Sequence, residues 1–250
     1  MIDPCLPRRD QVFYGYTMFS ILTFGFLIGM RHALEADHVA AVASLATGSK
    51  STREAIFHGA IWGLGHTIAL LAIGTVVILM NSSVPEAIAH WLEFTVGVML
   101  VLLGADVIRR LIRDRIHFHF HKHASDDSVH LHAHSHRGEG KHRLSPHDHR
   151  HEKGVTARVL AVGIMHGLAG SAALVLLVAG TIENTMTGLL YIILFGFGSV
   201  VGMAALSAVI AIPLRYSATS MTWAFNGLQA IVGVATISLG AYTMYSIGLA

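Results

Sequence analysis

Long apolar stretches constrain this chain more than any other feature of its sequence. A helix needs about 20 apolar residues to cross the ~30 Å hydrocarbon layer of a bilayer. Six stretches approach or exceed that length: 24–46, 57–80, 91–111, 157–180, 187–213 and 223–247. Of the 250 residues 53% are hydrophobic and only 13% are charged, which is not the profile of a soluble domain. The sequence therefore predicts an all-α integral membrane protein with six transmembrane helices.

Lys and Arg are concentrated on one side of the predicted spans. The loop near 50–53, the long central loop and the loop near 215 carry most of them, whereas the loops near 81–90 and 181–186 have none. Basic loops remain on the cytoplasmic side of a membrane. We therefore expect a multi-pass protein of the inner (cytoplasmic) membrane, with the central loop in the cytoplasm and both termini outside.

The two halves of the chain resemble each other. Three pairs of segments match in the same order and at nearly constant spacing: 29–34 with 163–168, 62–66 with 195–199, and 96–105 with 232–241. With three spans in each half, the second half must cross the membrane in the opposite sense, as in the inverted repeats of secondary transporters. We predict two inverted three-helix halves, 1–111 and 155–250; chance similarity between Gly-rich apolar segments is the alternative.

The segment that joins the halves, 112–154, has a different composition. It holds twelve of the 18 histidines of the chain, many at alternate positions, among Arg, Lys, Asp, Glu, Ser and Gly. Because few apolar residues are present to build a core, we expect this His-rich loop to be disordered. It can offer many weak, interchangeable nitrogen sites to a metal ion. The alternative is a solvated linker whose histidines have no role.

Ionisable residues interrupt the first apolar stretch. Such groups are costly in a hydrocarbon layer and are kept there mainly for function. On an ideal helix His32, Glu35 and His38 share a face, whereas Asp37 is turned by about 140° from His32. We expect either a local opening of the helix or a division in which the histidines bind a metal ion and Asp37 orients an imidazole. The alternative is an interfacial cap in which Arg31 compensates the carboxylates.

These residues also carry a resemblance to a known family. The stretch from His32 through Asp37 to His38 resembles the HxxxxDH signature of the nickel/cobalt transporter (NicO/NiCoT) superfamily, and Leu-Gly-His66-Thr resembles its LGH[ST] motif. His166-Gly-Leu-Ala-Gly-Ser is similar to the HGLAGS pattern of the UreH-type branch of urease accessory proteins. The acidic motif that nickel permeases of this superfamily have near this position is absent. The resemblance implies the transport of nickel or cobalt ions.

We predict a metal site formed by histidines and acidic residues of the spans: His32, Glu35, Asp37, His38, His66 and His166. Imidazole with carboxylate suits Ni(II), Co(II), Zn(II) or Cu(II). The predicted substrate is Ni(II), with Co(II) as a second candidate, and no prosthetic group is expected. The predicted partners are this ion, the lipid bilayer and a cytoplasmic nickel chaperone, with no nucleic acid; the oligomeric state is left open.

The predicted function is a secondary transporter that supplies nickel enzymes such as urease by uptake. Inward movement gains roughly 2.3 kcal/mol per charge per 100 mV of membrane potential, so a divalent ion needs no ATP. An efflux transporter is the first alternative, and a non-transporting metallochaperone or metal sensor that acts through the His-rich loop is the second. No Walker loop, HExxH motif or nucleophile–base pair is present, so we do not expect an enzyme.

Overall fold

The computed structural model describes residues 9–80, 85–113, 116–122, 129–135, 151–168, 184–220 and 222–248. Seven helices and two strands lie in these residues. In chain order they are α1 (Arg9–His32), α2 (Ala36–Gly48), α3 (Thr52–Met80), α4 (Glu86–Arg113), β1 (Ile116–Lys122), β2 (Val129–Ser135), α5 (His151–Gly167), α7 (Thr185–Ser220) and α8 (Thr222–Gly248).

Four of the described helices are long and apolar enough to cross a membrane. They are Thr52–Met80, Glu86–Arg113, Thr185–Ser217 and Trp223–Gly248, which match the second, third, fifth and sixth predicted spans. The first predicted span is divided between α1 and α2. The fourth begins in α5, and its remainder, from 169 onward, lies outside the described residues. The helical fold that the composition predicts is therefore present, with several helices long and apolar enough to span a membrane.

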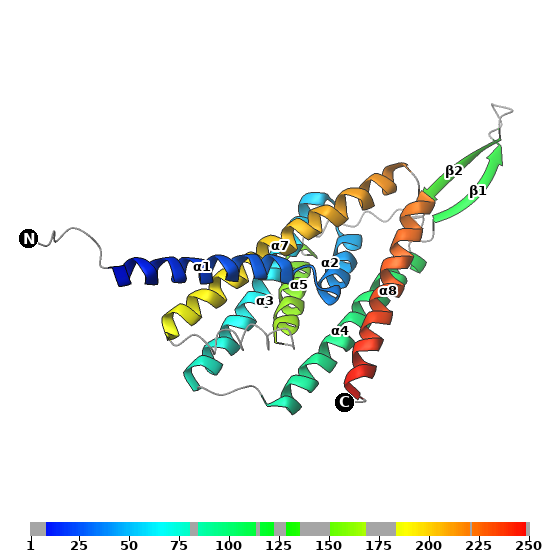
Figure 1. The fold of residues 1–250 in the computed structure, drawn as a ribbon. Coiled ribbons are helices and arrows are strands. Elements are labelled where there is room, and N and C mark those ends of the chain that lie inside the picture. The colour runs from blue at the N-terminus through cyan, green and yellow to red at the C-terminus, as the bar shows by residue number, and fades with distance from the viewer. Residues whose placement is uncertain are drawn as a thin grey trace, which may run out of the picture.

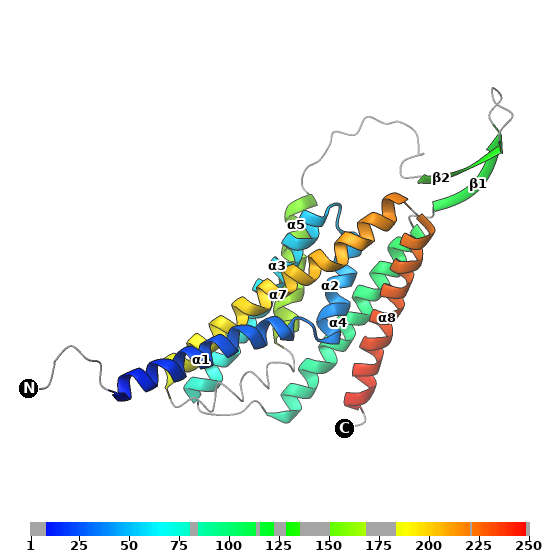
Figure 2. The same ribbon diagram turned by 45° about the horizontal axis from the view of Figure 1, so that its top comes forward.

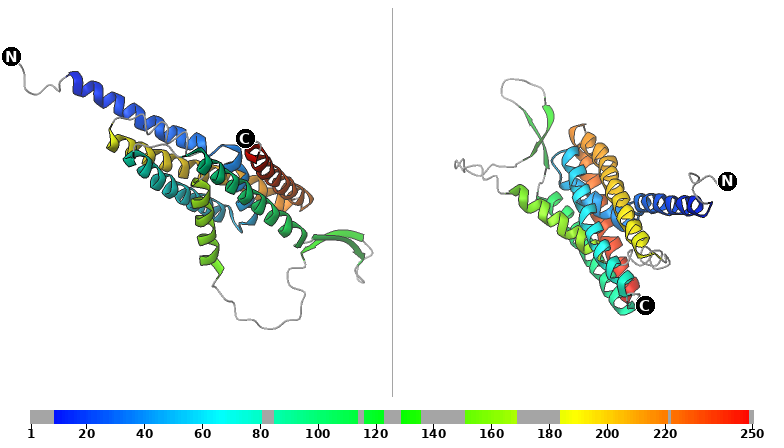
Figure 3. Two further views of the ribbon diagram at one scale, coloured as in Figure 1. Left: turned by 90° about the horizontal axis from the view of Figure 1, so that it is seen from below. Right: turned by 90° about the vertical axis from the view of Figure 1, so that its left-hand side faces the viewer.

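The long helices pack as neighbouring pairs. α3 lies along α7, and α4 lies along α8 (Figure 1). α1 packs against α7, α5 packs against α3, and the two views of Figure 3 have α1 and α5 on opposite flanks of the α3–α7 pair. The C-terminal end of α4, the N-terminal end of α5 and the α7–α8 junction lie at the same end of the molecule (Figure 2).

Glycines allow these helix pairs to approach until their backbones touch. A Cβ atom at Gly29 of α1 would overlap the carbonyl oxygen of Phe195 in α7. In the same way, a Cβ atom at Gly163 of α5 would overlap the carbonyl oxygen of Trp62 in α3. Small residues at such crossings are typical of helix packing in membranes, where close contact replaces the hydrophobic effect as the driving force.

The short helix α2 occupies the interior of the bundle, where it contacts α3, α4, α7 and α8 (Figure 2). Its sequence is rich in alanine, and Ala41, Val42 and Ala43 are buried. Trp62, Leu100 and Met203 complete the main apolar core around it. Because small side chains let the surrounding helices close around α2, the polar residues at both of its ends are held inside the protein.

The two strands form an antiparallel hairpin within the His-rich loop, with Ile116 opposite Ser135 and Lys122 opposite Val129 (Figure 2). We expected no regular structure here, so the hairpin departs from that expectation and adds strands to the predicted all-α fold. Its physical basis is the strict alternation of histidine with apolar residues, which is the period of a strand. Apart from these strands and the ends of α4 and α5, the loop lies outside the described residues.

Candidate metal centre

The site begins where the first predicted span breaks. α1 ends at His32 and α2 begins at Ala36, and between them Glu35 has an extended backbone with φ −65° and ψ 149°. The N–H of Leu34 donates to the carbonyl of Arg31, and that of Glu35 donates to the carbonyl of His32, which forms a tight turn. Of the two alternatives that the sequence left open, the local opening of the helix is therefore present, and it turns the residues of α2 relative to His32.

Four histidines from four helices meet at this break. We call them the imidazole cluster: His32 of α1, His38 of α2, His66 of α3 and His166 of α5. The ring centre of His38 lies 4.3 Å from that of His32, 4.3 Å from that of His166 and 5.2 Å from that of His66. Their exposed fractions are 5% for His32, 1% for His166 and 0% for the other two. The fold thus brings together histidines that are up to half the chain apart in sequence.

Two carboxylates fix the orientation of three of these rings. Glu35 Oε1 lies 2.8 Å from His32 Nδ1. Asp37 contacts two imidazoles, with Oδ1 at 2.8 Å from His38 Nδ1 and Oδ2 at 3.1 Å from His166 Nε2. An imidazole that donates one N–H to a carboxylate has its other nitrogen free to bind a metal, so these contacts select which nitrogen is available.

Those other nitrogens are buried and have no hydrogen-bond partner within the described ranges. They are His32 Nε2, His38 Nε2, His166 Nδ1 and both ring nitrogens of His66. A buried polar atom without a partner costs about 1–3 kcal/mol, so native proteins have few of them. Nothing among the residues that the structure describes accounts for their concentration at one place. A divalent cation that accepts imidazole lone pairs would satisfy several of them at once.

Two overlapping groups of donor atoms are close enough to hold such an ion. His32, His38 and His66 form one group, and Asp37, His38 and His166 form the other. The donor atoms of each group lie within 4.8 Å of one another, and His38 belongs to both. Nitrogen donors with a single carboxylate suit divalent transition metals better than Mg²⁺ or Ca²⁺, which prefer oxygen.

The predicted site residues therefore lie together, with one difference in arrangement. Glu35 joins neither donor group and instead contacts His32 from the outer side, where its side chain is 48% exposed. The alternative of an interfacial cap loses support, because Arg31 is exposed and forms no ion pair with Glu35 or Asp37. Residues 169–171, the end of the HGLAGS motif, lie outside the described residues.

Two aromatic residues of the site were not predicted. Trp62 is fully buried, and its ring centre lies 5.4 Å from that of His38 and 5.1 Å from that of His166. Phe195 is equally enclosed, and its ring centre lies 5.2 Å from that of His32. These rings form an aromatic wall of the imidazole cluster, in which Trp62 Nε1 is also buried without a described partner. The signal was present in the sequence, since 62 and 195 occupy equivalent positions in the internal repeat.

Comparison with known proteins gives three informative relatives. The chain is 37% identical to the urease accessory protein UreH of Bacillus sp. (strain TB-90), over 96% of this chain and 95% of that protein. It is 26% identical to a Methanocaldococcus jannaschii protein provisionally named a nickel/cobalt efflux system, over 73% of this chain and 72% of that protein. It is 28% identical to chloroplast protein FOR GROWTH AND FERTILITY 1 of Arabidopsis thaliana, over 74% of this chain and 48% of that protein. No protein-family model and no solved structure matches.

Proposed function

Because the chain belongs to the family of the urease accessory protein UreH, in the nickel/cobalt transporter superfamily, we propose that it is a secondary transporter of Ni(II) in the cytoplasmic membrane. Co(II) is the second candidate substrate. The names of its relatives describe accessory and transport proteins, so its role is one of metal handling and not of catalysis. The observation that carries the proposal is the imidazole cluster, buried among apolar helices with nitrogen atoms turned toward one another.

In this proposal three imidazoles bind the ion and the carboxylates orient them. His32 and His38 bind through Nε2, which their contacts with Glu35 and Asp37 leave free, and His66 supplies a third nitrogen. The second donor group, with His166, forms a neighbouring position for the ion. Since His38 is common to both groups, an ion can pass from one to the other without losing all of its protein ligands.

Pairs of matching helix contacts support the predicted inverted repeat. α1 packs on α7 as α5 packs on α3, which is the exchange expected when the two halves are related by a two-fold axis. A Cβ atom at Gly97 of α4 would lie 2.9 Å from the carbonyl oxygen of Gly240 in α8. In the matching contact, a Cβ atom at Gly233 of α8 would lie 3.3 Å from the carbonyl oxygen of Gly104 in α4. We propose six spans in two inverted halves, with the imidazole cluster between them, as in other secondary transporters.

The proposed direction is uptake, with the His-rich loop in the cytoplasm and both termini outside. The membrane potential drives a divalent cation inward by about 4.6 kcal/mol per 100 mV. In this orientation the loop can receive the ion and pass it to a cytoplasmic nickel chaperone. Efflux is the second candidate, because the Methanocaldococcus relative is named for that direction.

The test is flux into liposomes that contain the purified protein. Ni(II) and Co(II) entry is followed under an imposed potential, inside negative, for the wild type, His38→Ala and a variant without residues 117–151. His90→Ala is the matched control, because His90 is an exposed histidine outside the imidazole cluster. We expect flux in the wild type, in His90→Ala and in the loop deletion, and its loss in His38→Ala.

Three outcomes would overturn the proposal or its direction. If the wild type moves neither metal while its His-rich loop binds Ni(II), the protein is a metallochaperone or sensor. If His38→Ala carries metal as fast as the wild type, the imidazole cluster is not the transport site. Flux that requires an opposing proton gradient and runs outward would assign the protein to efflux.

A further inference from the structure

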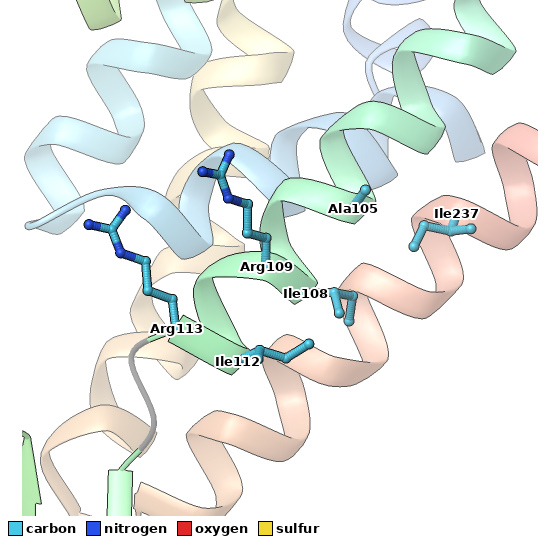
Figure 4. A pocket seen from close by; sticks show the side chains of 6 residues that line it. All are labelled: Ala105, Ile108, Arg109, Ile112, Arg113 and Ile237. Carbon is cyan, nitrogen blue, oxygen red and sulfur yellow. The ribbon is translucent and has the colours of Figure 1, made fainter.

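A groove lies on the outer face of the α4–α8 pair, and no residue of the imidazole cluster lines it. Figure 4 labels its six lining residues, five on α4 and one on α8: Ala105, Ile108, Arg109, Ile112, Arg113 and Ile237. Its volume is about 470 Å³. Isoleucine and alanine form most of the lining, which is almost wholly apolar. The side chains of Arg109 and Arg113, one helical turn apart, extend in parallel from α4 on the side away from the isoleucines (Figure 4). Two positive charges therefore lie beside the apolar groove, across the crest of α4.

The two arginines differ from their neighbour Arg110. Arg110 is engaged, with Nε at 3.1 Å from Asp106 Oδ2 and a donated hydrogen bond of 3.2 Å to the carbonyl of Ser44. Arg109 and Arg113 are exposed, and neither has an acceptor among the residues that the structure describes. A cation near a helix C-terminus complements the helix dipole. That effect explains the charge on this turn but not the apolar groove beside it.

The length of α4 indicates how deep Arg109 and Arg113 lie in the membrane. α4 has 28 residues, which span about 42 Å at 1.5 Å per residue. The hydrocarbon core is only ~30 Å thick, so the last turns of α4 reach the level of the lipid headgroups. Ile108, Ile112 and Ile237 then lie beside the upper parts of the acyl chains, and the guanidinium groups lie beside the phosphates.

We propose that the groove binds an anionic phospholipid. The headgroup phosphate lies between Arg109 and Arg113, and an acyl chain covers Ile108, Ile112 and Ile237. Basic pockets between transmembrane helices are known to recognise such headgroups on the cytoplasmic side. Because the groove joins α4 to α8, the bound lipid fastens one half of the proposed repeat to the other. The assignment of this lipid to the cytoplasmic leaflet rests on the proposed function. The proposal that the groove binds a lipid is independent of it.

The test measures lipid retention and does not involve metal. The full-length protein is exchanged into an equimolar mixture of phosphatidylglycerol and phosphatidylcholine in detergent, and the bound lipids are counted by native mass spectrometry. We expect the wild type to prefer phosphatidylglycerol by roughly tenfold, since two basic residues face the headgroup. Arg109→Gln/Arg113→Gln should lose this preference. Lys50→Gln/Arg53→Gln, which removes the same charge from the α2–α3 loop and the first turn of α3, should keep it.

Two further variants keep the result interpretable. Arg109→Lys/Arg113→Lys retains the charge and should retain the preference, even if the glutamine variant folds poorly. Ile112→Asn should weaken retention of both lipids, because it makes the floor of the groove polar. Equal retention of the two lipids by the wild type would overturn the proposal. An undiminished preference in the glutamine variant, or displacement of phosphatidylglycerol by inorganic phosphate alone, would do the same.

Discussion

Helix α2 has buried polar groups at both of its ends, and the two ends differ in how these groups are satisfied. At the N-terminal end the imidazole cluster contains five ring nitrogens without a described partner. At the C-terminal end Arg110 donates to the carbonyl of Ser44 at 3.2 Å and to Thr47 Oγ1 at 3.3 Å. Arg215 donates to the carbonyl of Ser49, whose hydroxyl lies 3.3 Å from His58 Nδ1.

This difference suggests that one end of α2 contributes to stability and the other to ion binding. Arginines that donate hydrogen bonds to the carbonyl groups at the end of a helix stabilise the folded state and fix the position of α2. Unpartnered nitrogens do the opposite, since each costs free energy unless a ligand satisfies it. We infer that the C-terminal end anchors α2 and that the N-terminal end is maintained for an ion. Substitutions at the two ends should therefore have opposite consequences for stability and binding.

We expect His66→Leu to have the largest effect, a loss of Ni(II) affinity. Leucine fills a similar volume but removes two buried nitrogens that have no partner in the described structure. We expect Ni(II) affinity to fall by more than the ~10–100-fold that follows the loss of an orienting group. In metal-free protein the thermal midpoint should not fall. Calorimetric titration and thermal unfolding in detergent measure the two quantities. A lower midpoint with unchanged affinity would reverse the roles assigned to the two ends.

A smaller loss of binding is expected from Asp37→Asn. The amide removes the negative charge that faces His38 and His166 but retains an oxygen that can accept one hydrogen bond. Because Asp37 orients the rings in the proposal, we expect Ni(II) affinity to fall by about 10–100-fold. Titration of this variant beside His66→Leu is the measurement. A loss as large as that of His66→Leu would make Asp37 a direct ligand, as in the second donor group.

Arg110→Gln should have the smallest effect on Ni(II) affinity. It should also have the clearest effect on stability. This variant removes the charged hydrogen bonds to the carbonyl of Ser44 and to Thr47 Oγ1, which should cost about 1–3 kcal/mol of stability. Ni(II) affinity should remain within about twofold of the wild type, since the arginine lies at the other end of α2. Arg53→Gln is the control, because Arg53 is exposed and has no acceptor among the described residues. If Arg110→Gln reduces affinity without lowering the thermal midpoint, the two ends are coupled more tightly than the comparison implies.

The sequence predicted most of the helical fold and the membership of the site. Apolar length identified the spans, and the cost of charge in hydrocarbon singled out His32, Asp37 and His38. A local opening of the helix between His32 and His38, one of the two alternatives, is present as the turn between α1 and α2. That these residues bind metal stays a prediction. The same holds for the six-span topology and its orientation.

Other features could not be obtained from the sequence because they depend on how helices pack. The contact of Arg110 with Ser44 joins residues 66 positions apart. The wall formed by Trp62 and Phe195 exists only once α3, α5 and α7 surround the break in the first span. The hairpin was missed for a different reason. We interpreted its alternating histidines as composition, although alternation is also the period of a strand.

The full enclosure of His38 and His66 also affects the rate of the proposed ion transport. A hydrated ion cannot reach a nitrogen that has no exposed surface, so its water molecules must be exchanged one after another for protein donors. In the proposed transport, passage through the site would be a series of ligand substitutions and not diffusion along a wet pore. Mg²⁺, which gives up its water reluctantly, is excluded by the same step. Slow transport and the exclusion of abundant cations such as Mg²⁺ would then have the same cause. Both properties suit the supply of a trace metal.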